Sequence, residues 1–143
     1  RLQWKGKGIV TKAFQDISAI IDAAGLCIFF SIRNLASKDL GVAPVGILKY
    51  LNTATGVNYT LEELQKAGER IITAERLFLN KAGFDRKDDS LPTRLTEKPM
   101  PEGPSKGMVC HIDEMLDEYY QARGWTPNGI PTPELLEKLG LHQ

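Results

Sequence analysis

The residues with the clearest chemical potential lie in one short stretch, Asp22-Ala23-Ala24-Gly25-Leu26-Cys27. It places a carboxylate, which accepts hydrogen bonds, close to a cysteine, whose thiolate binds soft metals. The glycine between them favours a left-handed turn or a close backbone approach. These residues alone leave two interpretations open. The stretch is either a ligand-binding turn or a helix end with a buried cysteine that packs as a small apolar side chain.

Asp22 gives one reason to expect a binding partner. The apolar pattern before it predicts a helix that ends near Gly25, so the carboxylate lies at a helix C-terminus. The partial negative charge of that end makes it an unfavourable place for another negative charge. We therefore expect Asp22 to meet a ligand or a cation.

A second cysteine stands beside a histidine in Cys110-His111. Combined with Cys27 and His142, this pair suggests a zinc site, but the spacings match no familiar zinc pattern. The preferred interpretation is that Cys110 is a free thiol and that His111 precedes or caps a helix beginning at Ile112.

The elements that must position these residues are helices. Apolar residues recur at steps of three and four from Ile9 onward, and the pattern predicts a helix with Ile17, Ile20 and Ile21 in the core and Lys12 and Asp16 on the opposite side. The run from Ile28 to Leu35 is apolar on every side, which predicts burial on every side.

Local signals mark the later helices. Thr60-Leu61-Glu62-Glu63 reads as a capping box, and Thr132-Pro133 with Gly140 gives a cap, a first-turn proline and a stop. Further helices are expected over 43–55 and from Ile112 to Arg123. No strand hairpin is indicated, so the fold class is all-α, an irregular bundle of about five or six helices.

A long proline-rich strap occupies residues 84–107, which carry four of the eight prolines. A loop of this length without periodicity is either functional or disordered. We expect it to be an ordered loop over the helices, with charged side chains in ion pairs. These are Arg86, Asp88, Asp89 and Arg94.

Bulk composition narrows the class of protein. The 143 residues carry 18 Lys plus Arg and 18 Asp plus Glu, and this neutral balance argues against a nucleic-acid or anionic-membrane binder. Two cysteines in a chain of this size favour a reducing compartment, and we expect a cytoplasmic protein without a membrane segment. Because the first residue is Arg1, we expect a processed chain or a piece of a longer one.

Four segments, in the same order, resemble the tungsten-containing aldehyde:ferredoxin oxidoreductases. They are Asp22-x-x-Gly25-Leu26-Cys27, Gly83-Phe84-x-Arg86-x-Asp88-Asp89-x-Leu91-Pro92-x-Arg94, Met115-Leu116-Asp117-x-Tyr119-Tyr120-x-x-Arg123-Gly124-Trp125, and Asn128-Gly129-Ile130-Pro131-Thr132-Pro133. The resemblance runs from about Asp16 to Leu141. It implies that residues 1–143 are a single helical domain, the last of a longer enzyme.

The resemblance also implies roles for residues of the first segment. Cys27 would be the fourth ligand of a 4Fe-4S cluster, whose other three cysteines lie in an earlier domain. Asp22 would accept hydrogen bonds from a pterin of the tungstopterin or molybdopterin cofactor, and Gly25 and Leu26 would approach it through their backbone. The catalytic acid–base groups would lie in preceding domains, so no catalytic residue is expected in this fragment.

The implied reaction is oxidation of an aldehyde to a carboxylic acid with ferredoxin as electron acceptor. The isolated fragment is expected to be inactive, to hold no cofactor and to expose the Asp22–Cys27 motif. Its partners would be the N-terminal domains of the same polypeptide, ferredoxin and the aldehyde substrate. The substrate and the choice of tungsten or molybdenum stay open. So does an alternative, a stand-alone helical interaction module that binds a protein near Ile28–Ile32.

Overall fold

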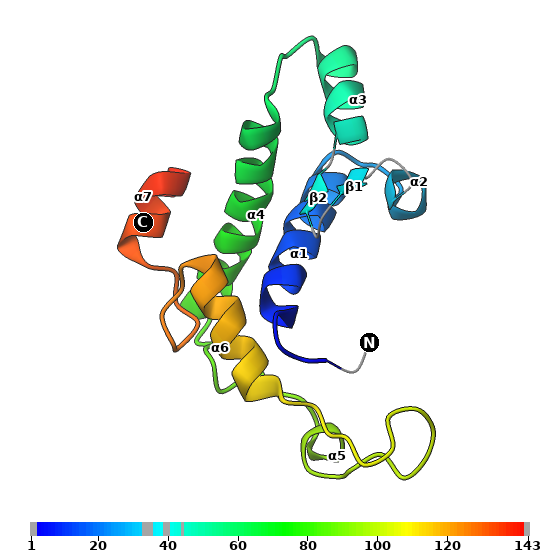
Figure 1. Ribbon diagram of the computed structural model, residues 1–143. Helices are drawn as coiled ribbons and strands as arrows, with labels where there is room; N and C mark the ends of the chain where they lie inside the picture. Colours follow the sequence, from blue (N-terminus) through cyan, green and yellow to red (C-terminus); the bar gives the residue numbers. More distant parts are fainter. Residues whose placement is uncertain (1–2, 33–35, 39–40, 44, 142–143) are drawn as a thin grey trace.

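The computed structural model describes residues 3–32, 36–38, 41–43 and 45–141. Over these residues the fold is helical, which confirms the all-α class (Figure 1). The elements in order are α1 (Lys7–Ala23), α2 (Ile28–Ile32), β1 (Ala36–Lys38), β2 (Gly41–Ala43), α3 (Val45–Thr55), α4 (Leu61–Lys81), α5 (Thr93–Thr96), α6 (Ile112–Arg123) and α7 (Pro133–Leu139).

The described residues contain more elements than the sequence predicts, because the short helix α5 and the strands β1 and β2 were not anticipated. Helices α2 and α5 have five and four residues. β1 and β2 form an antiparallel ribbon in which Ala36 pairs with Ala43 and Lys38 with Gly41, so the expectation of no hairpin was wrong. Three residues a strand are too few to give a recognisable alternation of apolar and polar side chains.

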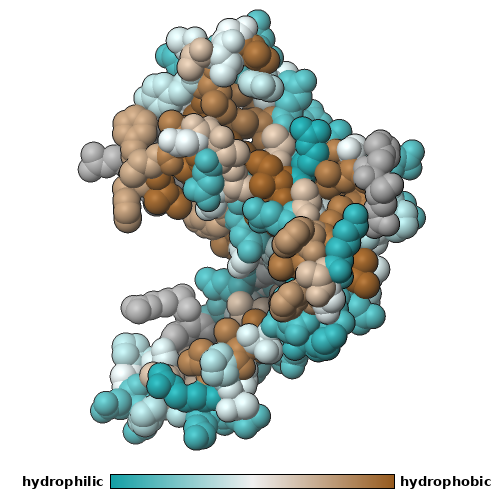
Figure 2. All heavy atoms as spheres, turned by 180° about the vertical axis from the view of Figure 1, so that it is seen from behind, coloured by the Kyte–Doolittle hydropathy of each residue, from teal (hydrophilic) through white to brown (hydrophobic). Residues whose placement is uncertain are grey.

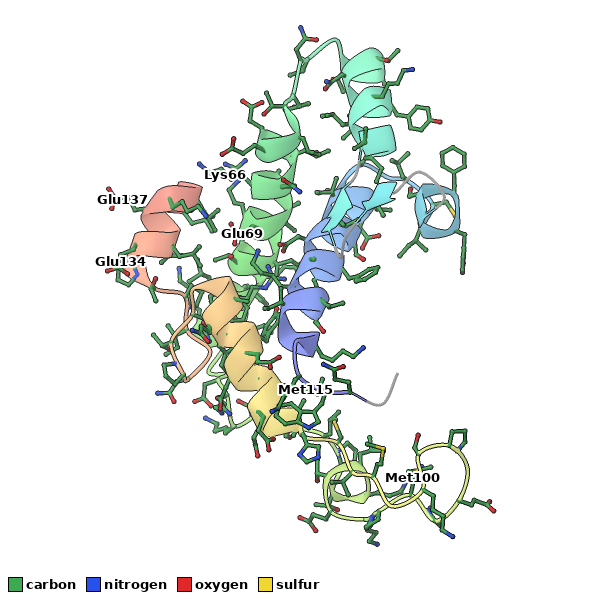
Figure 3. All side chains as sticks on the ribbon, viewed as in Figure 1. Lys66, Glu69, Met100, Met115, Glu134 and Glu137 are labelled. Carbon is green, nitrogen blue, oxygen red and sulfur yellow. The ribbon has the colours of Figure 1, made fainter. Side chains whose placement is uncertain are left out.

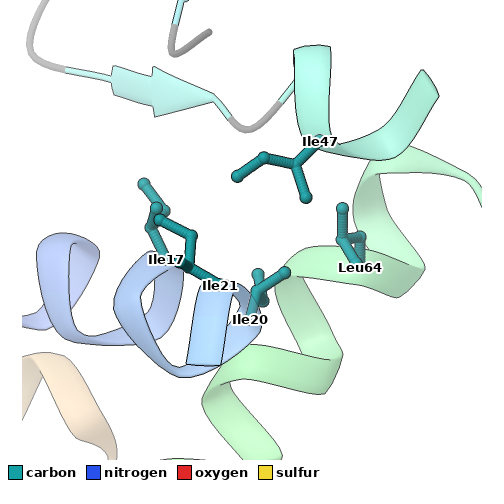
Figure 4. Packing of buried hydrophobic residues seen from close by; sticks show 5 residues of the cluster. All are labelled: Ile17, Ile20, Ile21, Ile47 and Leu64. Carbon is teal, nitrogen blue, oxygen red and sulfur yellow. The ribbon is translucent and has the colours of Figure 1, made fainter. Parts of the chain in front are cut away.

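The main core lies where α1, α3 and α4 meet. Ile17, Ile20, Ile21, Ile47 and Leu64 are buried there and pack together (Figure 4). On α4, Gly68 lies against the backbone of α1: a Cβ at this position would be 2.3 Å from the carbonyl oxygen of Asp16. The absence of a side chain at Gly68 therefore sets how closely the two long helices approach.

A second cluster joins α6 to the C-terminal residues. Tyr120, Trp125, Leu135 and Leu139 form its buried part. The ends of the later helices lie where the sequence signals predict. Thr60 and Glu63 form the capping box at the start of α4, and Thr132 caps α7. The left-handed glycines Gly124 and Gly140 follow α6 and α7 as C-caps.

Residues 84–107 divide into two parts. The first part packs on the helices, where Arg86 pairs with Asp117 at 2.6 Å and Asp89 pairs with Arg76. The second part, with α5, projects beyond the start of α6 instead of covering the bundle (Figure 1). Neither Asp88 nor Arg94 forms an ion pair with a described residue, so that expectation was wrong for these two.

None of the helices in the described part of the chain is both long enough and apolar enough to cross a lipid bilayer.

Candidate functional site

The Asp22–Cys27 stretch forms the C-terminal cap of α1. Gly25 has φ 66°, its amide donates to the Asp22 carbonyl at 3.0 Å, and the Leu26 amide donates to the Ile21 carbonyl at 3.0 Å. This is the pattern of a Schellman motif, in which a left-handed residue closes the last turn. Leu26 packs against the main core, which anchors the turn. The left-handed stop expected at Gly25 is thus present.

Cys27 directly follows this turn and precedes α2. Its thiol is free and exposed, and its carbonyl accepts a hydrogen bond from the Ser31 amide at 3.0 Å. The backbone around the thiol is therefore fixed on both sides, by the Schellman turn and by the first turn of α2. An anchored backbone with an exposed thiol suits a metal ligand, because the sulfur is accessible without unfolding.

Asp22 lies on the last turn of α1 with its side chain exposed. No described residue donates a hydrogen bond to its carboxylate or pairs with it. It borders a hollow of about 630 Å³ between α1 and α4, which is also lined by Phe14, Ser18 and Glu75. The oxygens of the Asp22 carboxylate therefore remain available to accept hydrogen bonds, as far as the described residues are concerned.

An apolar rim surrounds the motif. Ile28, Phe29 and Phe30 on α2 are 40%, 82% and 54% exposed, and Val45 and Tyr50 on α3 are 49% and 46% exposed. Figure 2 shows apolar side chains gathered over this end of the molecule. The predicted burial of the run was wrong for Ile28, Phe29 and Phe30, and residues 33–35 lie outside the described part. The five-residue α2 lies at the edge of the bundle (Figure 1), and the described elements leave its side chains Ile28, Phe29 and Phe30 exposed.

The position of α1 is fixed by contacts with α6 that the local sequence pattern does not predict. Arg123 of α6 is buried, forms an ion pair with Asp16 and donates to the Tyr119 hydroxyl at 2.9 Å. Asp16 also accepts from Lys12 at 2.8 Å. Asp16 was expected on the solvent face, but a partner far along the chain makes its burial possible.

The start of α1 is held by α6 as well. The Glu118 carboxylate accepts from the Gly6 amide at 2.9 and 3.0 Å and from the Gly8 amide at 3.3 Å. It therefore satisfies amides that the first turn leaves unpaired. A Cβ at Gly8 would be 2.5 Å from the Tyr119 amide nitrogen, so glycine permits this close contact. The Gly6-Lys7-Gly8 spacing is the sequence signal for this approach.

The zinc hypothesis receives no support. Among the described residues, no group of three or more His, Cys, Asp or Glu side chains is placed to hold a metal. Cys27 follows α1, whereas Cys110 precedes α6 and donates its amide to the Leu95 carbonyl at 2.8 Å. His111 stacks on Trp4, with ring centroids 5.2 Å apart, and His142 lies outside the described residues.

The donors at the motif fit part of a cofactor site. One exposed thiol matches one ligand of an iron–sulfur cluster, which needs four thiolates in its usual form. The Asp22 carboxylate, which has no partner among the described residues, is a group of the kind that accepts N–H donors of a heterocycle. The surface at Gly25 is open, since an added Cβ would meet nothing within 4 Å. The remaining donors would have to come from outside this chain.

Comparison with known proteins gives consistent matches. The family model described as aldehyde ferredoxin oxidoreductase, domains 2 and 3, matches residues 1–141. A tungsten-containing aldehyde ferredoxin oxidoreductase of Pyrococcus abyssi (strain GE5 / Orsay) is 48% identical over 131 residues, which are 91% of this chain and 20% of that protein. An aliphatic sulfonate oxidoreductase, WOR-like subunit, of Pyrococcus furiosus is 33% identical over 134 residues, 87% of this chain and 20% of that protein.

One solved structure is also similar. It is the active-site complex BamBC of benzoyl coenzyme A reductase in complex with 1,5-dienoyl-CoA, with a TM-score of 0.55 and 34% identity. The match covers 66% of this chain and 13% of that chain. The present chain thus spans about one fifth of the length of the curated relatives it matches.

Proposed function

Because this chain belongs to the aldehyde ferredoxin oxidoreductase family, we propose that it is the C-terminal domain of an enzyme that oxidises aldehydes to carboxylic acids with ferredoxin as electron acceptor. The family's curated members include tungsten-containing enzymes, and a tungstopterin (or molybdopterin) together with a 4Fe-4S cluster is the proposed cofactor set. The chemistry that these groups supply when bound is two-electron oxidation at the metal and one-electron transfer through the cluster.

Cys27 is the proposed fourth ligand of the cluster. The observation that carries this proposal is the exposed, free thiol on a backbone fixed between the Schellman turn and α2. Cys110, the other cysteine, precedes α6, and its amide is bonded to Leu95. The two thiols therefore have distinct surroundings, and only Cys27 stands within the Asp-x-x-Gly-Leu-Cys motif.

Asp22, Gly25 and Leu26 are the proposed contacts to the pterin. The unpaired carboxylate of Asp22 would accept ring N–H groups, and the backbone of Gly25 and Leu26 would pass close to the cofactor. Support comes from the open surface at Gly25 and from the Leu26 side chain, which packs against the main core and anchors the turn. No group in this chain is assigned to acid–base catalysis.

The apolar rim around the motif is the proposed contact with the preceding domains of the same polypeptide. Phe29 is 82% exposed and lies beside the exposed Ile28 and Phe30. An apolar group of this kind is unusual unless a partner surface covers it. The fragment alone would then be inactive, because three cysteines, the second pterin contact and the substrate-activating groups lie elsewhere. The free thiols agree with a reducing, cytoplasmic location.

Electron paramagnetic resonance of the full-length enzyme tests this function. Cys27→Ala should abolish the signal of the reduced four-iron cluster, or replace it by the signal of a three-iron species in the oxidised protein, because a thiolate ligand is lost. Cys110→Ala is the matched control and should leave the signal unchanged. An unchanged signal in Cys27→Ala would exclude Cys27 as a ligand.

A further inference from the structure

The lobe formed by residues 92–110 has no role in the proposed function, yet with the first described residues and the start of α6 it borders an open hollow of about 400 Å³. This volume lies in the range of small-molecule sites. Backbone hydrogen bonds hold the lobe in shape: the Cys110 amide donates to Leu95 at 2.8 Å, and the Met100 amide donates to Met108 at 3.0 Å. The walls of the hollow are therefore formed by the fold itself.

The walls of the hollow are mainly apolar. All three methionines of the chain line it, and Figure 3 shows Met100 on the lobe and Met115 on the first turn of α6. Methionine side chains adapt to irregular apolar ligands because they are unbranched and polarizable. Trp4 adds an aromatic wall that is held by stacking on His111.

Three cations complete the lining. Lys7, Arg94 and Lys98 border the hollow, and no Asp or Glu is among the described residues that line it. None of the three forms an ion pair with a described residue. The carboxylates nearby on α6 are engaged, since Glu118 accepts from Gly6 and Gly8 and Glu114 meets His111 at 3.4 Å. In a chain with no net charge, this is a local positive excess.

We propose that this hollow binds a monocarboxylate with an apolar tail, of the size of octanoate. The carboxylate pairs with Arg94 and Lys98, because a guanidinium forms two parallel hydrogen bonds to a carboxylate. The tail lies on the methionines and on Trp4. A neutral ligand would leave the cations unpaired, and an amine would be repelled by them.

This site is distinct from the cofactor motif. Lys7 is the first residue of α1, and Asp22 and Cys27 lie at its other end. Seventeen residues of helix span about 25 Å at 1.5 Å per residue. The proposal goes beyond the proposed function and does not depend on it, so the two can fail separately.

Photoaffinity labelling of the full-length enzyme tests the site. The probe is octanoic acid that carries a diazirine in its tail, and labelled peptides are identified by mass spectrometry after digestion. Labelling is expected on peptides between residues 91 and 115, and it should be displaced by octanoate but not by octylamine. The variant is Arg94→Gln with Lys98→Gln. The control is Lys81→Gln with Lys106→Gln, which makes the same charge change at exposed residues outside the hollow.

The expected result is a loss of at least about tenfold in octanoate-competed labelling for the Arg94 and Lys98 variant, because two charge-assisted contacts are removed. The control variant should label as the wild type does. Labelling only elsewhere in the enzyme, equal competition by octylamine, or full labelling of the Arg94 and Lys98 variant would each overturn the proposal. Absence of any label on these peptides would mean that another part of the enzyme fills the hollow, and would overturn it too.

Discussion

The two halves of α1 differ in how many of their polar groups find a partner within the described chain. From its N-terminus to its middle, Glu118 accepts hydrogen bonds from the Gly6 and Gly8 amides and Asp16 pairs with the buried Arg123. Toward its C-terminus, the Asp22 carboxylate has no described partner, the Cys27 thiol is exposed and Phe29 is 82% exposed. The N-terminal part of the helix is thus satisfied within this chain, whereas the proposed function assigns groups from outside the chain to the C-terminal end.

The largest effect should come from breaking the contacts of the N-terminal part. Arg123→Met removes the partner of a buried carboxylate, and we expect the free energy of unfolding to fall by about 4 kcal/mol. Asp16 keeps its contact with Lys12, which moderates the loss. Denaturant unfolding of the chain, followed by circular dichroism, measures the change.

Lys138→Met is the matched control. Lys138 pairs at 3.4 Å with Glu69, which Figure 3 labels on α4. The Lys138 side chain is 64% exposed. An exposed pair of this kind contributes less than about 1 kcal/mol. Equal losses in the two variants would contradict the view that the pairing of Asp16 and Arg123 is what fixes α1.

A somewhat smaller effect is expected at Gly68, where α1 and α4 touch. Gly→Ala inside a helix normally stabilises by about 1 kcal/mol. Here the added methyl would lie 2.3 Å from the Asp16 carbonyl oxygen, so the helices must separate. We expect Gly68→Ala to destabilise the chain by about 3 kcal/mol, measured by the same unfolding curves. Stabilisation would show that the helices do not pack this closely.

Acid should weaken the contacts between α4 and its neighbours at a defined pH, because Arg76 and Glu69 of α4 both form ion pairs with other segments. Burial alone would raise the pKa of Asp89, but hydrogen bonds from Arg76 and Tyr120, with the Arg76 charge, outweigh burial and hold the pKa below its ordinary 3.8. Glu69 behaves similarly, since its contacts with Lys12 and Lys138 outweigh burial and lower its pKa below 4.5. Such carboxylates bind fewer protons in the folded than in the unfolded chain, so their stabilisation is full above the unfolded pKa and is lost as the pH falls through the folded pKa.

The free energy of unfolding should therefore stay level from about pH 7 to pH 5 and fall below about pH 4. Asp89→Asn should lower it by about 2 kcal/mol at neutral pH, since a charged hydrogen-bond acceptor is lost. The same variant should make the fall in acid shallower. An identical slope in wild type and variant would show that Asp89 does not contribute to the acid sensitivity.

Features that depend on neighbouring residues could be predicted from the sequence, whereas features that depend on distant residues could not. The Schellman turn at Gly25, the capping box at Thr60 and the stop at Gly140 rest on neighbouring residues, and all are present. Burial of Asp16 depends on Arg123, 107 residues away, and no local pattern contains that pairing.

The candidate site was predictable to the same extent. Its turn is local, so the placement of Gly25, Leu26 and Cys27 followed from the pattern of residues. The exposure of α2 could not be predicted from its composition. An apolar run indicates that its side chains are buried in the folded protein, but not whether the residues that bury them belong to this chain.

The smallest effect is expected beyond the C-terminal end of α1. Phe29→Ser should change the unfolding free energy of this chain by less than about 0.5 kcal/mol, because the side chain makes few contacts here. In the full-length enzyme the same variant should be clearly destabilised, as a lower melting temperature in calorimetry would show. Equal, small effects in both would indicate that the apolar rim is not covered in the full-length enzyme.

Thiol accessibility in the full-length enzyme tests the central claim most directly. In the cofactor-loaded protein treated with iodoacetamide, peptide mass spectrometry should find Cys27 unmodified while Cys110, which is partly exposed in this chain, reacts. After removal of iron with a chelator, Cys27 should become alkylated, because the thiol that this chain leaves exposed is then free. Alkylation of Cys27 in the loaded enzyme at the rate seen after iron removal would contradict its assignment as a cluster ligand.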